Sequence, residues 1–296
     1  MRAATIRWKG EESAAIVLAD GWVPVDAINE RWGRRWPTDM LDLISTGGFD
    51  ELHAWYRAEG GERLERERPV PFGEAAYAPL YRHPRKIWGI GLNYVEHAAD
   101  LAEKAPDDEP ASFMKPDTTI IGPGEAIAIP RQSERTTAEA ELGIVLGRKC
   151  RDVEREDWLS VVAGFTTILD MTAEDILRKN PRFLTRAKSF DTFFSFGPQL
   201  VTPDEVADVM KLNVATVING KVHARNVVSN MTFPPDYLVS FHSRVMTLLP
   251  GDIISTGTPK AVHVRGGDVV ECRIDGFAAL VNPVIDLKER PASPRS

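Results

Sequence analysis

The sequence predicts a β-rich α+β protein, in which a small N-terminal α+β domain precedes a larger domain of mixed sheets. From residue 86 onward, apolar segments rich in β-branched residues recur at short intervals between Gly, Pro or Asp, and helical patterns are few. The regular alternation of strand and helix that marks a doubly wound fold is missing. With 296 residues, 43% of them hydrophobic and 27% charged, the chain has a globular composition and enough length to bury a large core.

The first part of the chain predicts two kinds of element. Strands are expected at residues 3–8 and 13–25, and helices at 40–47 and 49–60, where apolar residues recur at helical spacing. A polar connector that contains proline follows near residues 65–85. The expected domains are a small α+β domain over residues 1–80, a larger domain over 81–287, and a disordered tail over 288–296.

In the larger domain the strand patterns outnumber the helical ones. Strands are expected at residues 86–94, 126–130, 140–147, 165–171, 198–202, 212–220, 252–259, 268–274 and 278–286. Helices are expected at residues 95–104, 173–180 and 237–249.

Charge and cysteine content exclude several classes of protein. The net charge of −7 and the pI of about 5.5 argue against nucleic acid or an anionic membrane as a partner, because both require basic surfaces. Cys150 and Cys272 stand far apart without paired spacing, as in a reducing compartment. No apolar run suffices for a signal peptide or for the roughly 18 residues of a transmembrane helix. We therefore expect a cytoplasmic protein that acts on a small molecule.

The segment Thr136–Gly147 reads as a core strand and yet carries two acids. Alternate residues of a strand point to the same face, so Glu139 and Glu141 share a face. Two like charges side by side are unfavourable unless a cation lies between them, and a hard divalent cation such as Mg²⁺ suits carboxylates. The alternative is a solvated face of an edge strand. Asp170, which closes the apolar part of the next expected strand, favours the metal interpretation as a third acid.

Other polar residues stand in patterns that fit a catalytic site. Lys188 lies in a segment crowded with phenylalanines, where a lysine is either paired with an acid or functionally tuned; the alternative is a solvated loop lysine. His97 and Asp100 are three residues apart on an expected helix, so the carboxylate can orient the imidazole; the alternative is an ordinary helix surface. Gly257 lets the backbone approach a ligand beside the hydroxyl of Thr258; the alternative is a tight turn between strands.

Several stretches, taken in order, resemble the fumarylacetoacetate hydrolase family. They cover roughly Ile87 to Asp286 and read GLNYVEHAAD, FMKP, EAELGIVLG, GFTTILDMTAED, RAKSFDTF, VING, MTLLPGD and ISTGTP. The resemblance implies a roll of mixed β-sheets around a central site. It also implies a Mg²⁺ or Mn²⁺ cofactor, a homodimer, and a place in the catabolism of aromatic or sugar acids.

Roles for individual residues follow from the same resemblance. Glu139, Glu141 and Asp170 match the metal ligands of the family. The implied catalytic residues are His97, Asp100 and Lys188, with Asp100 standing where a glutamate is usual. The implied substrate contacts are Lys115, Arg186, Gly257 and Thr258. The run KAVHV at residues 260–264 departs from the usual glycines, which points to an altered choice of substrate.

The family's shared chemistry acts on a 2-oxo acid through a metal-stabilised enolate. We expect hydrolysis of a C–C bond in a 2,4-dioxo acid of the acylpyruvate or fumarylacetoacetate type, with His97 and Asp100 activating water. Decarboxylation of oxaloacetate and isomerisation of a hydroxymuconate-type diacid would use the same enolate, so both remain alternatives. The non-enzymatic alternative is a metal-dependent protein that binds a 2-oxo acid.

Overall fold

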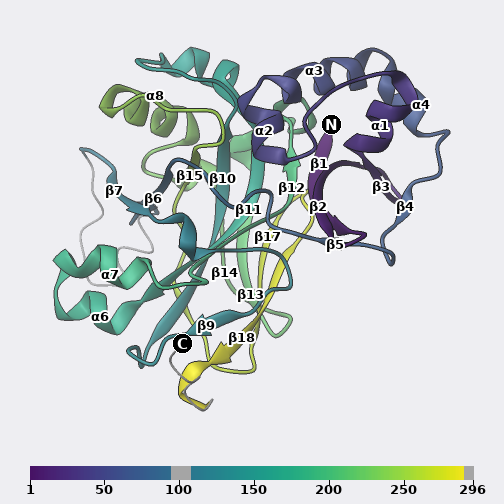
Figure 1. The fold of residues 1–296 in the computed structure, drawn as a ribbon. Coiled ribbons are helices and arrows are strands. Elements are labelled where there is room, and N and C mark those ends of the chain that lie inside the picture. Colours follow the sequence, from purple (N-terminus) through teal and green to yellow (C-terminus); the bar gives the residue numbers. More distant parts are fainter. Residues whose placement is uncertain (95–107, 290–296) are drawn as a thin grey trace.

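The computed structural model of the chain describes residues 1–94 and 108–289. Within these residues the strands form a sheet of 13 strands and a sheet of five, which share a hydrophobic core (Figure 1). The strands of the larger sheet are β1 (Arg2–Trp8), β2 (Glu11–Val17), β3 (Gly21–Pro24), β4 (Val70–Pro71), β5 (Ala76–Tyr77), β6 (Ile87–Gly91), β7 (Ala111–Lys115), β8 (Ile120–Ile121), β10 (Thr136–Leu146), β11 (Val162–Ala173), β12 (Phe194–Val201), β15 (Ile253–Ser255) and β16 (Val262–His263). The strands of the smaller sheet are β9 (Ile127–Ile129), β13 (Asn213–Ile218), β14 (Lys221–Val227), β17 (Val269–Ile274) and β18 (Leu280–Asp286).

The helices lie around these sheets. They are α1 (Val25–Trp32), α2 (Met40–Ser45), α3 (Gly48–Trp55), α4 (Gly61–Leu64), α6 (Glu174–Lys179), α7 (Leu184–Lys188) and α8 (Pro235–Val245). Figure 1 shows α1 to α4 gathered beside β1 to β5, and α6 and α7 on the other side of the long strands. A membrane-spanning segment is not found among the described helices, since each is too short or too polar to cross a bilayer.

β10 and β11 lie in the middle of the larger sheet and pair antiparallel, and every residue in both strands is buried. β10 also pairs with β15 and β16 on its other edge. One face of β10 presents Ala138, Ala140 and Leu142 to the core that it shares with the smaller sheet. The alternation of side chains along a strand then places the two acids of β10 on the opposite face. These acids are therefore interior groups.

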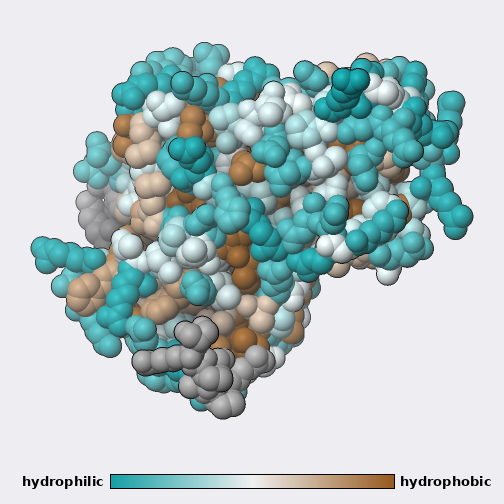
Figure 2. Space-filling model, viewed as in Figure 1, coloured by the Kyte–Doolittle hydropathy of each residue, from teal (hydrophilic) through white to brown (hydrophobic). Residues whose placement is uncertain are grey.

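The N-terminal strands and helices share a core with the central strands. β1 pairs with β12, and a hydrophobic cluster joins Ile16, Phe49 and Leu52 to Phe194 and Phe196. The helices follow amphipathic patterns: α3 buries Phe49 and Leu52. The face seen in Figure 2 is largely hydrophilic over these helices, as expected when their apolar sides face inward. Because one sheet crosses from the N-terminal part into the rest, the boundary near residue 80 stays a prediction.

The predicted β-rich α+β fold is confirmed, and the differences concern elements that the sequence did not predict and the ends of others. Elements without a predicted counterpart include β7, β14, α1 and α7. β12 begins at Phe194, four residues before the expected start, because the aromatic run there pairs with β8 and β11. α8 ends at Val245 rather than residue 249, since Met246 is extended and Leu248 bridges to Cys150. The helix expected at 95–104 lies outside the described residues. Residues 287–289 of the chain's end form a short 3₁₀ turn, and 290–296 lie outside the description.

Candidate metal centre

The register of β10 and β11 brings three acids together. Glu139 lies directly opposite Asp170 in the antiparallel pair, and Glu141 follows two residues along on the same face. One carboxylate oxygen from each acid can be chosen so that all lie within 4.8 Å of one another. The exposed fractions are 7% for Glu139, 1% for Glu141 and 0% for Asp170, so the interpretation as a solvated strand face is wrong.

Two lysines neutralise part of this charge. Lys188, at the end of α7, places its Nζ 2.7 Å from Glu139 Oε2 and 2.7 Å from Asp170 Oδ2. Lys115, at the end of β7, places its Nζ 2.5 Å from Asp170 Oδ1. Lys188 Nζ also lies 4.9 Å from the centre of the Phe113 ring. Lys188 is thus a buried and paired lysine rather than a solvated one.

The protonation of these groups follows from burial and from their partners. Burial opposes the charge on Lys188, but Asp170, Glu139 and Glu141 outweigh it and raise the pKa of the ammonium. Burial likewise opposes the charge on Asp170, yet Lys115 and Lys188 hold the pKa of its carboxyl below the usual range. For Lys115, burial dominates and lowers the pKa. Lys188 therefore stays cationic and Asp170 stays ionised at neutral pH.

Glu141 differs from the other two acids because neither lysine bonds to it. Its Oε2 accepts hydrogen bonds from Ser255 Oγ at 2.6 Å and from the backbone N–H of Gly257 at 2.8 Å. Burial, together with the nearby charges of Asp170 and Glu139, raises the pKa of Glu141 to about 8. Glu141 is therefore a buried carboxylate that lacks a cationic partner among the described residues.

These observations fit a divalent cation. When all three buried carboxylates are ionised, the two ammonium groups leave one net negative charge, and the raised pKa of Glu141 reflects the cost of that uncompensated charge. The donors are all carboxylate oxygens, which are the ligands that Mg²⁺ and Mn²⁺ prefer. The residues present can therefore hold such a metal.

The remaining predicted site residues are distributed differently. Thr258 is buried, and its hydroxyl donates to the carbonyl of Lys260 within the same turn. Gly257 has a φ of +95°, and its N–H holds Glu141 rather than pointing to an open space. Arg186 is exposed on α7 and donates a hydrogen bond to Gln132 Oε1 at 3.0 Å, and Gln132 is not part of the acidic cluster. His97 and Asp100 lie outside the described residues.

Sequence reasoning missed two hydroxyl groups that hold the acids. Thr172 Oγ1 donates to Glu139 Oε1 at 2.5 Å, and Ser255 supports Glu141 as described above. Thr172 stands two residues after Asp170 on the same strand face, so spacing alone could have found it. Ser255 ends β15, and nothing in the sequence shows that β15 pairs with β10.

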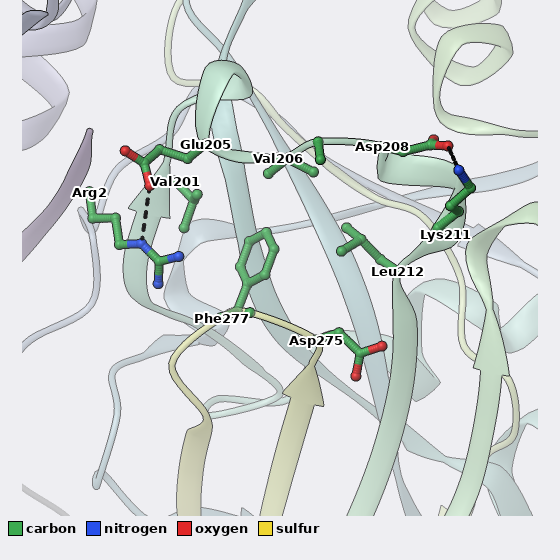
Figure 3. A pocket seen from close by; sticks show the side chains of 11 residues that line it. Arg2, Val201, Glu205, Val206, Asp208, Lys211, Leu212, Asp275 and Phe277 are labelled. Atoms are coloured by element: carbon green, nitrogen blue, oxygen red, sulfur yellow. Dashed lines mark ion pairs between the residues drawn. The ribbon is translucent and has the colours of Figure 1, made fainter.

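A surface groove of about 410 Å³ offers a contrast to this cluster. Figure 3 shows the Phe277 ring within it, with acids at both sides. Those acids have cationic neighbours: Arg2 lies 3.6 Å from Glu205, and Lys211 lies 3.2 Å from Asp208. The groove shares no residue with the acidic cluster and has no comparable uncompensated carboxylate.

Known proteins resemble this chain over most of its length. A mitochondrial oxaloacetate tautomerase, fahd2 of Xenopus laevis, is 37% identical over 217 residues, which is 70% of this chain and 67% of the relative. The crystal structure of 5-carboxymethyl-2-hydroxymuconate delta-isomerase from Mycobacterium smegmatis is 29% identical, with a TM-score of 0.75, and covers 97% of this chain and 99% of its own. Maleylpyruvate hydrolase from Sphingobium sp. SYK-6, in complex with manganese(II) and pyruvate, is 28% identical, with a TM-score of 0.79 and coverage of 97% and 99%.

The family described as fumarylacetoacetate (FAA) hydrolase, C-terminal, matches residues 86–285. That range contains the three acids, both lysines and the turn at Gly257. Because the match spans more than half of the chain, this protein belongs to the fumarylacetoacetate hydrolase family.

Proposed function

We propose that this protein is a divalent-metal-dependent enzyme that hydrolyses a C–C bond in a 2,4-dioxo acid of the acylpyruvate type. The observation that carries the proposal is the buried set of three carboxylates, two of which share the ammonium of Lys188 at 2.7 Å. Such a site suits a cation and, next to it, anionic oxygens of a substrate. The similar fold of a hydrolase described with manganese and pyruvate supports this reading.

The residues divide the work as follows. Glu139, Glu141 and Asp170 would hold Mg²⁺ or Mn²⁺, and the bound cation would supply Lewis acidity toward the 2-oxo group. Lys188, which stays cationic, would stabilise the enolate oxygen that forms when the C3–C4 bond breaks. Water would add its hydroxyl to C4, and C3 would take up a proton, so the products are a carboxylic acid and pyruvate.

The base for water activation is proposed from the sequence. His97 and Asp100 would remove the proton from the attacking water, with the carboxylate orienting the imidazole. Both residues lie outside the described part of the chain. The described groups around the acids are two lysines and hydroxyls, of which Lys188 is held in its charged form and so does not serve as a base.

A second candidate is chemistry on oxaloacetate. It is favoured by the relative of 37% identity that is named an oxaloacetate tautomerase. Decarboxylation would place the same enolate against the same lysine and would release CO₂ without a water attack. Tautomerisation would need only the movement of a proton between C3 and the 2-oxo oxygen. Neither reaction requires the water-activating pair.

The experiment is a proton NMR time course with Mg²⁺, in which acetylpyruvate and oxaloacetate are supplied to the wild-type protein, to Glu141→Gln and to Glu174→Gln. Glu174 is the matched control, because it is also a buried acid but pairs with Arg135 and Arg178 outside the cluster. We expect acetate and pyruvate to appear only with metal, in the wild type and in Glu174→Gln. Full turnover by Glu141→Gln, or with EDTA present, would refute the metal site.

The two substrates separate the candidates. If pyruvate forms from oxaloacetate above the Mg²⁺-only background while acetylpyruvate stays unchanged, the protein is a decarboxylase and the proposed C–C hydrolysis is refuted. If the protein speeds the keto–enol exchange of oxaloacetate and forms neither pyruvate nor CO₂, the activity is tautomerisation instead.

A further inference from the structure

Lys115 is a buried lysine whose bonds all go to the protein. Its side chain is 0% exposed, and its Nζ donates to Asp170 Oδ1 and to the backbone carbonyl of Lys188, both at 2.5 Å. These contacts join three elements, since Lys115 ends β7, Asp170 lies in β11 and Lys188 ends α7. The carbonyl that it bonds is one of those left without a partner at a helix C-terminus. Lys115 is therefore enclosed by protein next to Asp170, and its side chain has no exposed surface for a substrate.

The second ammonium changes the charge balance of the cluster. Lys188 already bonds Glu139 and Asp170, so each oxygen of Asp170 carries one lysine. With both lysines charged and all three acids ionised, the cluster has one net negative charge. One divalent cation then makes it net positive by one. Without Lys115, the loaded cluster would be neutral, and an anion would meet no net attraction.

We propose that Lys115 is a positioning residue and counter-charge, which weakens the cluster's hold on the metal and strengthens the metal-loaded site's hold on an anionic 2-oxo acid. The inference rests on the proposed metal-dependent function and adds to it the charge that the site selects in its substrate. Lys115 acts through its bond to Asp170 and through the electrostatic effect of its charge on the metal and the substrate. A charge a few ångströms away in a buried site is poorly screened by solvent.

The test substitution is Lys115→Met, which keeps the length and apolar stem of the side chain and removes its charge. Mn²⁺ affinity is measured by electron paramagnetic resonance, and pyruvate affinity of the Mn²⁺-loaded protein by calorimetry. We expect Mn²⁺ to bind more tightly and pyruvate more weakly, each on the order of tenfold. Pyruvamide, a neutral probe of the same shape, should bind both proteins equally.

Lys86→Met is the matched control. Lys86 Nζ lies 2.6 Å from Asp252 Oδ2, and this lysine–aspartate pair, in which the aspartate is buried and the lysine side chain is 12% exposed, lies outside the acidic cluster. Both substitutions should lower the melting temperature, because each removes an ammonium group that is bonded to an oxygen of a buried carboxylate. Only Lys115→Met should move the two affinities in opposite directions.

Each other outcome has a distinct meaning. A wild type that binds no Mn²⁺ refutes the proposed function itself. Weaker binding of both Mn²⁺ and pyruvate in Lys115→Met, or equal losses for pyruvate and pyruvamide, refutes the counter-charge role. If Lys115→Met does not fold, Lys115→Gln is measured instead; it is also neutral but keeps a hydrogen-bond donor, and the same opposite shifts are expected.

Discussion

The turn at Gly257 gives a prediction whose size follows from the structure. Gly257 has a φ of +95° and donates its N–H to Glu141 Oε2 at 2.8 Å. A Cβ at this position would lie 2.8 Å from Asn93 Cβ and 3.1 Å from the carbonyl oxygen of Ile90. Asn93 cannot move aside readily, because its side chain makes three hydrogen bonds, two of them to Phe233 and one to the backbone of Thr256. Gly257→Ala therefore meets both backbone strain and a steric clash.

The two costs can be separated with a second glycine. Gly124 has a φ of +79°, and a Cβ there would meet nothing within 4 Å. Gly124→Ala should thus cost only the left-handed backbone, about 1–2 kcal/mol. Gly257→Ala adds overpacking of about 1–3 kcal/mol, which gives a total of roughly 2–5 kcal/mol. For a chain of this length each kcal/mol corresponds to a fall in melting temperature of roughly 1.6 °C.

The assay is urea unfolding of both variants in EDTA, followed by Mn²⁺ titration of the folded proteins. We expect the larger loss of unfolding free energy for Gly257→Ala, and a loss of Mn²⁺ affinity of roughly tenfold in that variant alone, because the N–H that fixes Glu141 is displaced. Equal destabilisation by the two substitutions would refute the argument from the close approach to Asn93. Unchanged Mn²⁺ affinity in Gly257→Ala would refute the role of the N–H.

Three further predictions concern other contacts. Lys188→Met should lower turnover by about 10²–10³ while Mn²⁺ still binds, and an unchanged rate would exclude a role for its charge in the reaction. Ser255→Ala should weaken Mn²⁺ binding by about tenfold, whereas Ser195→Ala, which removes a buried hydroxyl bonded to Asn282 instead, should leave Mn²⁺ affinity unchanged in the same titration. Burial lowers the pKa of His242, so the unfolded chain takes up a proton first as the pH falls, and the stability present above about pH 6.5 is lost below it. Between pH 7.5 and 5.5 the free energy of urea unfolding should therefore fall by up to about 1.4 kcal/mol more for the wild type than for His242→Gln. If the unfolding free energies of the two proteins change in parallel with pH, the buried imidazole is not held neutral.

The sequence by itself determined the fold class and the identity of the three acids. Spacing along one strand was enough to place Glu139 and Glu141 on the same face, because side chains alternate strictly in a β-strand. The apolar run before Asp170 marked its strand as buried, and this composition is also a local feature of the sequence. The ordered motifs then indicated the family, which the match over residues 86–285 confirms.

Only the tertiary structure decided which groups neutralise those acids. Lys115 and Lys188 lie 73 positions apart, yet the carbonyl of Lys188 bonds the ammonium of Lys115. Ser255 and Gly257 reach Glu141 across 114 and 116 positions. Such contacts depend on the strand order in the sheet, because β15 pairs with β10 although the two strands are far apart in the sequence. Local periodicity shows which face a side chain takes, whereas its partners depend on long-range packing, and these partners set the charge of the site.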